Sequence, residues 1–238
     1  MAAHPLDNPI WTALTTRQSH FAETDELARK FPAEISPLAG FEKPTAEAYA
    51  SLRKLLPTGG IAGLFLEAPA DQAAVEAAGC EIVEQGGLLQ MIYEDRDLPA
   101  PQQTRSADFA ELTAADAAEM LALAKMTKPG PFGMRTRELG TYLGIRRDGQ
   151  LAAMAGERLH LPGYTEISAV CTHPNHLGHG YATALMVELI RQIHSRNETP
   201  ILHVRPENAR AIELYRRLGF ADSRLSRYVV IRKSAAGL

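Results

Sequence analysis

Apolar positions in the second half of the chain repeat with the period of a helix. Tyr181, Leu185, Leu189 and Ile193 recur every four residues and predict a long amphipathic helix over residues 181–196. Shorter apolar runs between turn residues predict the other elements. The expected strands are residues 109–112, 141–146, 151–159, 165–172, 201–204 and 228–231, and the expected helices are residues 114–124 and 208–218. Strands that alternate with helices and include one hairpin indicate an α/β fold with a mixed α+β sheet.

The first half of the chain has the same kinds of element in a less regular order. The expected helices are residues 46–56 and 71–78, and the expected strands are residues 61–67, 80–83 and 88–93. A polar, Pro-rich stretch at residues 95–106 suggests a boundary between an N-terminal region, 1–100, and a C-terminal domain, 101–238. Both regions end with a strand, a short helix, a glycine and two strands. Two interpretations are open: the first region is a degenerate copy of the second, or a common pattern occurs twice by chance.

Composition excludes several classes of protein. The 238 residues are 45% hydrophobic and 22% charged with a net charge of -3, which is typical of a soluble globular protein and not of a disordered or nucleic-acid-binding one. The longest apolar runs, such as residues 61–66, are too short to span a membrane, and the N-terminus does not resemble a secretory signal. Cys80 and Cys171 are far apart, which fits a reducing compartment. We therefore expect a cytoplasmic protein that binds neither nucleic acid nor membrane.

The segment between the expected strand 165–172 and the long helix carries the clearest chemistry. Gly178 and Gly180 precede the helix N-terminus, where unpaired amide groups and the helix dipole favour an anion. This arrangement predicts a pyrophosphate site. A dinucleotide-binding fold would use the same turn, but Thr183 occupies the place of its third glycine, and the unit follows a hairpin. A Rossmann fold is therefore disfavoured, and a dinucleotide-dependent enzyme remains a rival hypothesis.

Two motifs together resemble one family. Residues 177–182, Leu-Gly-His-Gly-Tyr-Ala, resemble the pyrophosphate loop Gln/Arg-x-x-Gly-x-Gly/Ala of the GNAT superfamily of acyl-CoA-dependent N-acyltransferases in all but its first position. About thirty residues later, Asn208, Ala211, Leu214-Tyr215 and Gly219-Phe220 resemble a second signature of that family. The resemblance covers roughly residues 109–231. With its divergent N-terminal half, the chain looks like a bacterial group of predicted acetyltransferases, and the resemblance implies the GNAT-type acyl-CoA N-acyltransferase fold.

The resemblance implies a set of residues that bind acetyl-CoA. Main-chain groups of one strand would pair with the pantetheine arm, the glycine loop would hold the diphosphate, and an asparagine would contact the arm. These residues are Val170, Cys171 and Thr172 for the strand, Leu177, Gly178, His179, Gly180, Tyr181, Ala182 and Thr183 for the loop, and Asn208. Asn208 is equally explained as a helix N-cap. Leu177 replaces a family Gln or Arg, and His179 stands where a cation is common, so we expect weaker binding of the diphosphate.

The resemblance also implies two catalytic residues. Tyr215 corresponds to a family tyrosine that protonates the departing thiolate. The alternative role for Tyr215 is that of an aromatic side chain packed in the core. Glu166 is the candidate general base, because an amine must lose a proton before it attacks. The alternative is that Glu166 is a solvated residue of a strand without a catalytic role. Glu157 and Glu207 are weaker candidates for the base.

The expected activity is acetyl transfer from acetyl-CoA to an unidentified primary amine, directly in a ternary complex. Cys171 would then not act as a nucleophile. The alternative is a non-catalytic acyl-CoA-binding sensor module. His173, His176 and His179 are spaced by three, but a Pro-containing turn separates them, so we predict no metal site. The acceptor and the oligomeric state stay open, with a homodimer among the assemblies to consider.

Overall fold

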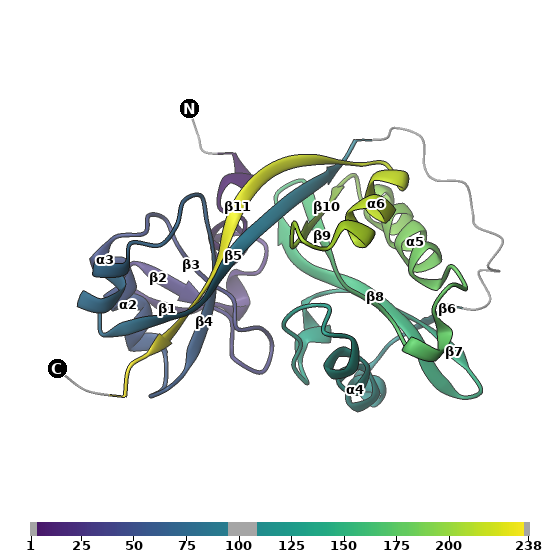
Figure 1. Ribbon diagram of the computed structural model, residues 1–238, viewed down its shortest axis with the longest axis horizontal. Coiled ribbons are helices and arrows are strands. Elements are labelled where there is room, and N and C mark those ends of the chain that lie inside the picture. The colour runs from purple at the N-terminus through teal and green to yellow at the C-terminus, as the bar shows by residue number, and fades with distance from the viewer. Residues whose placement is uncertain (1–3, 95–108, 236–238) are drawn as a thin grey trace. The chain divides into compact units, whose positions relative to one another are not determined.

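The computed structural model describes residues 4–94 and 109–235. The chain forms two compact units: the first comprises residues 1–89 and 224–238, and the second comprises residues 90–223. The predicted boundary at residues 95–106 lies outside the described residues. Strands β5 (Cys80–Tyr93) and β11 (Phe220–Lys233) each contribute residues to both units (Figure 1). The prediction that residues 1–100 are a reduced copy of the C-terminal domain stays a prediction.

The second unit is built on a mixed sheet, as the alternation of strands and helices predicts. From β11 the hydrogen-bonded order continues β5-β10-β9-β8-β7-β6. These strands are β6 (Phe109–Glu111), β7 (Tyr142–Arg147), β8 (Gln150–Leu161), β9 (Tyr164–Thr172) and β10 (Thr199–Val204). β6 to β9 pair antiparallel in sequence order, and β10 pairs with β9 in parallel. The predicted hairpin is confirmed: Asp148 and Gly149, with φ of 51° and 78°, link β7 to β8 in the left-handed geometry of a tight hairpin turn.

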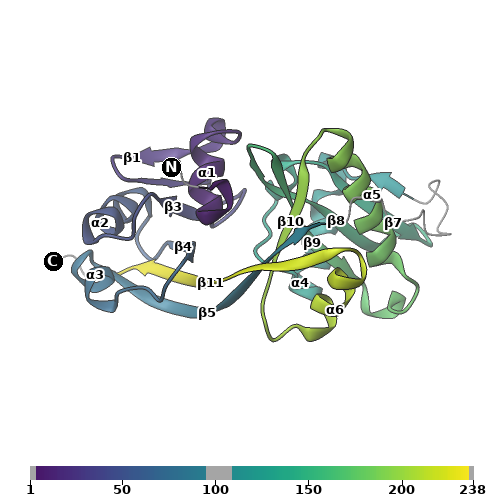
Figure 2. The same cartoon turned by 90° about the horizontal axis from the view of Figure 1, so that it is seen from above.

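Among the described residues of the second unit, three α-helices accompany the sheet: α4 (Ala117–Thr127), α5 (Tyr181–Ser195) and α6 (Ala209–Arg217). The four positions that predict α5 from their spacing are all buried. α4 contributes Met120 and Leu123 to a cluster with Met154 and Cys171 of the sheet. Figures 1 and 2 show α4 and α5 on opposite faces of the sheet, which explains why nearly all of β8 is buried.

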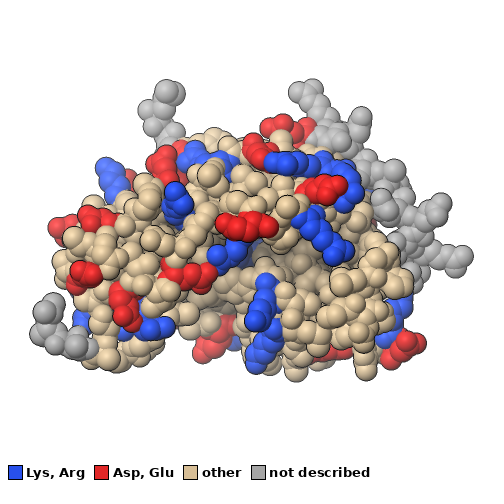
Figure 3. Space-filling view, in the orientation of Figure 1, with Lys and Arg blue, Asp and Glu red and all other residues tan. Residues whose placement is uncertain are grey.

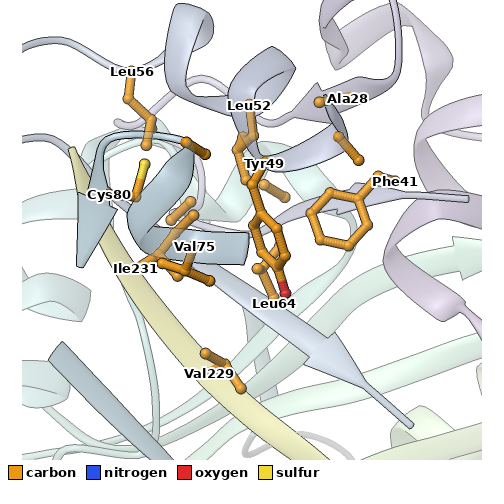
Figure 4. Close-up of a cluster of buried hydrophobic side chains, with 14 of the residues drawn as sticks. Ala28, Phe41, Tyr49, Leu52, Leu56, Leu64, Val75, Cys80, Val229 and Ile231 are labelled. Atoms are coloured by element: carbon orange, nitrogen blue, oxygen red, sulfur yellow. The ribbon is translucent and has the colours of Figure 1, made fainter. Parts of the chain in front are cut away.

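The first unit contains a further part of the sheet and a small separate sheet. β4 (Ile61–Leu66) pairs with β11, which pairs in turn with β5. Helices α2 (Ala46–Leu55) and α3 (Gln72–Ala77) match their predicted positions closely. Helix α1 (Pro9–Thr15) and the three-stranded sheet β1 (Glu23–Asp25), β2 (Ala28–Lys30) and β3 (Ala39–Phe41) lie in a segment for which the sequence suggests no element. In the core, Tyr49 of α2 points toward Phe41 of β3, with ring centroids 5.0 Å apart (Figure 4).

Three strand predictions are wrong in extent. The expected strands 80–83 and 88–93 form the single strand β5, which continues through Gly86 and Gly87. The expected strand 228–231 is the end of β11, which begins at Phe220. β5 lies between β11 and β10, so it is paired on both edges. This pairing from distant parts of the chain outweighs the local tendency of two glycines to interrupt a strand.

The distribution of charged side chains on the surface is consistent with the net charge of -3. On the face shown in Figure 3, basic and acidic side chains are interspersed. No helix within the described ranges is long and apolar enough to cross a membrane.

Candidate active site

Strands β9 and β10 separate soon after they begin. Among the described residues their parallel pairing covers three pairs and ends at Glu166–Ile201. On its other edge β9 stays paired with β8 as far as Thr172, with a shift in register around Ala169, whose φ is 53°. Residues 170–172 therefore have a strand partner on one edge only. An extended ligand can pair with the second edge as an added strand would.

The loop before α5 leaves room for an anion. Gly178 and Gly180 have φ of 83° and 74°, a left-handed conformation that favours glycine. A Cβ added at either glycine would meet no heavy atom within 4 Å, so both face open space. Gly180 is the N-cap of α5, and no side chain caps the first turn. The first amide groups of α5 are thus available to a phosphate.

Helix α6 presents the residues of the second motif. Asn208 is the predicted N-cap: its Oδ1 accepts a hydrogen bond from the backbone N–H of Ala211 at 3.2 Å. Tyr215 lies two turns further along the helix. Gly219 ends the helix with a φ of 100°, which confirms the predicted left-handed C′ position.

These three elements line one pocket of about 350 Å³. The pocket brings together Tyr215 and every residue that the resemblance implies for cofactor binding, from Val170 to Asn208. Five further residues line it that the motifs do not single out for binding: His176, Arg210, Ala211, Leu214 and Arg217. The periodicity of α6 could have placed Arg210 and Arg217 on one face of the helix, because they are seven residues, or two turns, apart.

Glu166 does not line the pocket, and neither do Glu157 and Glu207. The Glu166 side chain is completely buried, so the alternative that it is a solvated strand residue is wrong. It belongs to a buried polar row that crosses four neighbouring strands: Arg158 of β8, Glu166 of β9, His203 of β10 and Gln90 of β5.

The contacts of the buried polar row are short. Arg158 donates from Nε and Nη2 to the two oxygens of Glu166, at 2.8 and 2.6 Å. His203 donates from Nδ1 to Glu166 Oε1 at 2.6 Å, and Gln90 donates from Nε2 to His203 Nε2 at 3.1 Å. Burial opposes the charge of Glu166, but Arg158 and His203 hold its pKa down at about 2. Glu166 is therefore ionised near neutrality, with both oxygens engaged.

The two other titratable groups that bear on the chemistry stay protonated. Burial raises the pKa of the Tyr215 hydroxyl to about 12. Burial also raises the pKa of the Cys171 thiol to about 11, although hydrogen bonds to Thr127 and to the backbone of Met154 oppose the shift. Near neutrality the pocket thus contains a proton donor at Tyr215 and a thiol that is a poor nucleophile.

The structure is similar over almost its full length to that of a protein from Novosphingobium aromaticivorans assigned to the GNAT family of acetyltransferases. The two are 34% identical with a TM-score of 0.86, and the likeness covers 98% of this chain and 100% of that one. The chain belongs to the GNAT family. Residues 142–229 also match the sequence family described as FR47-like protein. Among proteins with curated descriptions, none is significantly similar.

More distant GNAT structures share the fold. A GCN5-related N-acetyltransferase from Kribbella flavida is 20% identical with a TM-score of 0.62, over 96% of both chains. A GCN5-related N-acetyltransferase-like protein from Streptococcus suis is 14% identical with a TM-score of 0.60, over 93% of this chain and 92% of that one. GNAT enzymes use acetyl-CoA, so membership supports acyl transfer as the reaction class. Across residues 4–94 and 109–235, no group of three or more His, Cys, Asp or Glu side chains could hold a metal ion.

Proposed function

We propose that the chain is an N-acetyltransferase that moves an acetyl group from acetyl-CoA to a primary amine by direct transfer in a ternary complex. One observation carries the proposal: a single pocket joins the unpaired edge of β9, the open glycine loop before α5, and Tyr215. The β9 edge can pair with the extended pantetheine arm, the glycine loop can bind the diphosphate, and Tyr215 can protonate the departing thiolate.

Different residues bind different parts of acetyl-CoA. The main chain of Val170, Cys171 and Thr172 pairs with the pantetheine arm, and residues 178–183 hold the diphosphate through backbone N–H groups. Asn208 hydrogen-bonds the arm. Leu177, which stands in place of a polar or basic residue, is 52% exposed and adds no charge. Arg210 and Arg217, from the wall formed by α6, supply positive charge to the same pocket.

The proton steps use Tyr215 and the buried polar row. The amine nitrogen attacks the thioester carbonyl while strand N–H groups stabilise the oxyanion, and the carbon–sulfur bond then breaks. Tyr215 donates its proton to the coenzyme A sulfur. We assign the amine's proton, passed through water, to the Glu166–His203 pair.

Binding and turnover can be tested separately. The full chain is titrated with acetyl-CoA by calorimetry and then assayed for release of free thiol with a panel of small amines, amino acids and peptides. We expect saturable binding and thiol release with at least one class of amine. Absence of any affinity for coenzyme A would contradict the proposal. Thermal stabilisation by NAD but not by acetyl-CoA would favour a dinucleotide-dependent enzyme instead.

The alternative, a non-catalytic acyl-CoA-binding sensor module, is favoured by one observation. Both oxygens of Glu166 are engaged and the residue lies off the pocket, and none of the described residues that line the pocket is an Asp or Glu that could face the acetyl group. That module would bind acetyl-CoA in the calorimeter and release no thiol with any amine of the panel.

Leu177→Arg is expected to strengthen acetyl-CoA binding about five-fold at low salt. The exposed leucine can be replaced without loss of packing, and one added charge near a phosphate contributes about 1 kcal/mol. Calorimetry at low and at high salt measures the gain, which should shrink as salt screens the charge. Leu225→Arg, at an exposed leucine of the first unit, is the matched control and should leave the affinity unchanged. An equal gain in both variants would show a non-specific effect of charge.

Cys171→Ala is expected to retain turnover within about threefold of the parent. The raised pKa of the Cys171 thiol leaves little thiolate at neutral pH, and direct transfer needs no acyl-enzyme. Steady-state assays of thiol release measure the effect. Loss of turnover with acetyl-CoA binding intact would replace direct transfer by a covalent route.

A further inference from the structure

Four aromatic rings lie one after another around the glycine loop. The ring centroids of His173 and His176 are 5.7 Å apart, those of His176 and His179 are 6.4 Å apart, and those of His179 and Tyr181 are 5.4 Å apart. Only the last pair is stacked, with an interplanar angle of 23°. Since none of the described residues forms a metal-binding group, these rings need another explanation.

The ring of His179 is held in one orientation. Its Nδ1 donates to the carbonyl oxygens of His176 and Leu177, at 3.2 and 3.1 Å. Beneath it, the ring of Tyr181 is fixed by Arg147, which donates from Nε to Tyr181 Oη at 2.8 Å and places its guanidinium carbon 4.9 Å from the ring centroid. Tyr181 is buried, whereas His179 is exposed and lines the pocket. The ring of His179, stacked on Tyr181 and exposed in the lining of the pocket, therefore offers an aromatic surface to a ligand.

The rest of the pocket shows which part of a donor this surface would meet. In the function proposed above, the β9 edge takes the pantetheine arm and the glycine loop takes the diphosphate, so the nucleotide remains. The α6 wall offers the exposed cations Arg210 and Arg217, which suit a phosphate group. The loop wall offers rings, and planar bases stack on aromatic side chains.

We propose that the exposed face of His179, supported by Tyr181 and Arg147, is a stacking platform for the adenine ring of the coenzyme A donor. The inference rests on the proposed function, since it requires that coenzyme A binds in this pocket. It implies that the chain recognises the nucleotide half of its donor by an aromatic contact, in a loop that lacks the basic residue at Leu177.

Ligand truncation combined with substitution tests the platform. Binding of coenzyme A and of 4′-phosphopantetheine, which lacks the nucleotide, is measured by calorimetry for the parent and for His179→Ala. We expect His179→Ala to weaken coenzyme A binding about tenfold and to change phosphopantetheine binding less than twofold. His179→Phe should restore coenzyme A affinity, because it restores an aromatic face, and His179→Lys should not.

His173→Ala is the matched control, because this histidine belongs to the same series of rings but does not line the pocket. It should bind coenzyme A as the parent does. Equal weakening of both ligands by His179→Ala, or restoration by lysine but not by phenylalanine, would overturn the platform and show a contact with phosphate. Failure of the parent chain to bind coenzyme A would instead overturn the proposed function itself.

Discussion

Tyr215→Phe is expected to lower kcat by at least about 100-fold while the affinity for acetyl-CoA changes less than threefold. Removal of the hydroxyl leaves the departing thiolate without a proton donor, and a positioned general acid contributes about 10²–10⁴-fold to a rate. The raised pKa of about 12 means that the tyrosine keeps its proton throughout the working pH range. Steady-state kinetics and calorimetry on the same preparation separate the two effects.

The control for Tyr215 is Tyr228→Phe, which removes a hydroxyl from β11 in the first unit. This variant should keep the parental kcat. If Tyr215→Phe also turned over at the parental rate, Tyr215 would have no part in the chemistry and its burial beside Phe220 would be a matter of packing alone.

Glu166→Gln is expected to reduce the free energy of unfolding by about 3–5 kcal/mol, because it leaves the charge of Arg158 buried without its counter-ion. Denaturant titration measures the loss. The double variant Arg158→Met/Glu166→Gln removes both charges and should recover part of it. Glu81→Gln, a half-exposed strand glutamate that pairs with Arg232, is the control and should cost less than about 1 kcal/mol.

The same carboxylate predicts a dependence of stability on pH. The folded pKa of Glu166, about 2, lies below its ordinary value of 4.5, so the stabilisation is complete above about pH 4.5 and is lost as the pH falls toward 2. Between these limits the parent should lose stability more steeply with acid than Glu166→Gln. Parallel curves for the two proteins would show that Glu166 is not an ionised partner of Arg158.

The buried polar row also relates stability to catalysis. Arg158, Glu166 and His203 join strands β8, β9 and β10 at the point where β9 and β10 stop pairing. Any substitution in the row therefore alters both the proposed route of the amine's proton and the support of the pocket. For this reason kinetic effects in the row should be compared with unfolding measurements on the same variants.

Local patterns in the sequence were sufficient for much of the second unit. The four-residue spacing of apolar positions determined α5, the Asp148-Gly149 pair determined the hairpin, and Gly219 determined the end of α6. Each of these features depends on interactions between residues close together in the chain. The two glycines before α5 likewise indicated the open loop, because their backbone conformation is a local property.

The tertiary structure alone decided the features that depend on distant partners. β5 continues through two glycines because β11 and β10 pair with its edges, and β11 pairs with β4 across more than half of the chain length. Glu166 is buried because Arg158 forms an ion pair with it, and because His203, from 37 residues further on, hydrogen-bonds to it. A sequence pattern shows which side chains are charged or apolar, but whether a carboxylate faces solvent, a substrate or a buried arginine is decided by the strands that fold against it.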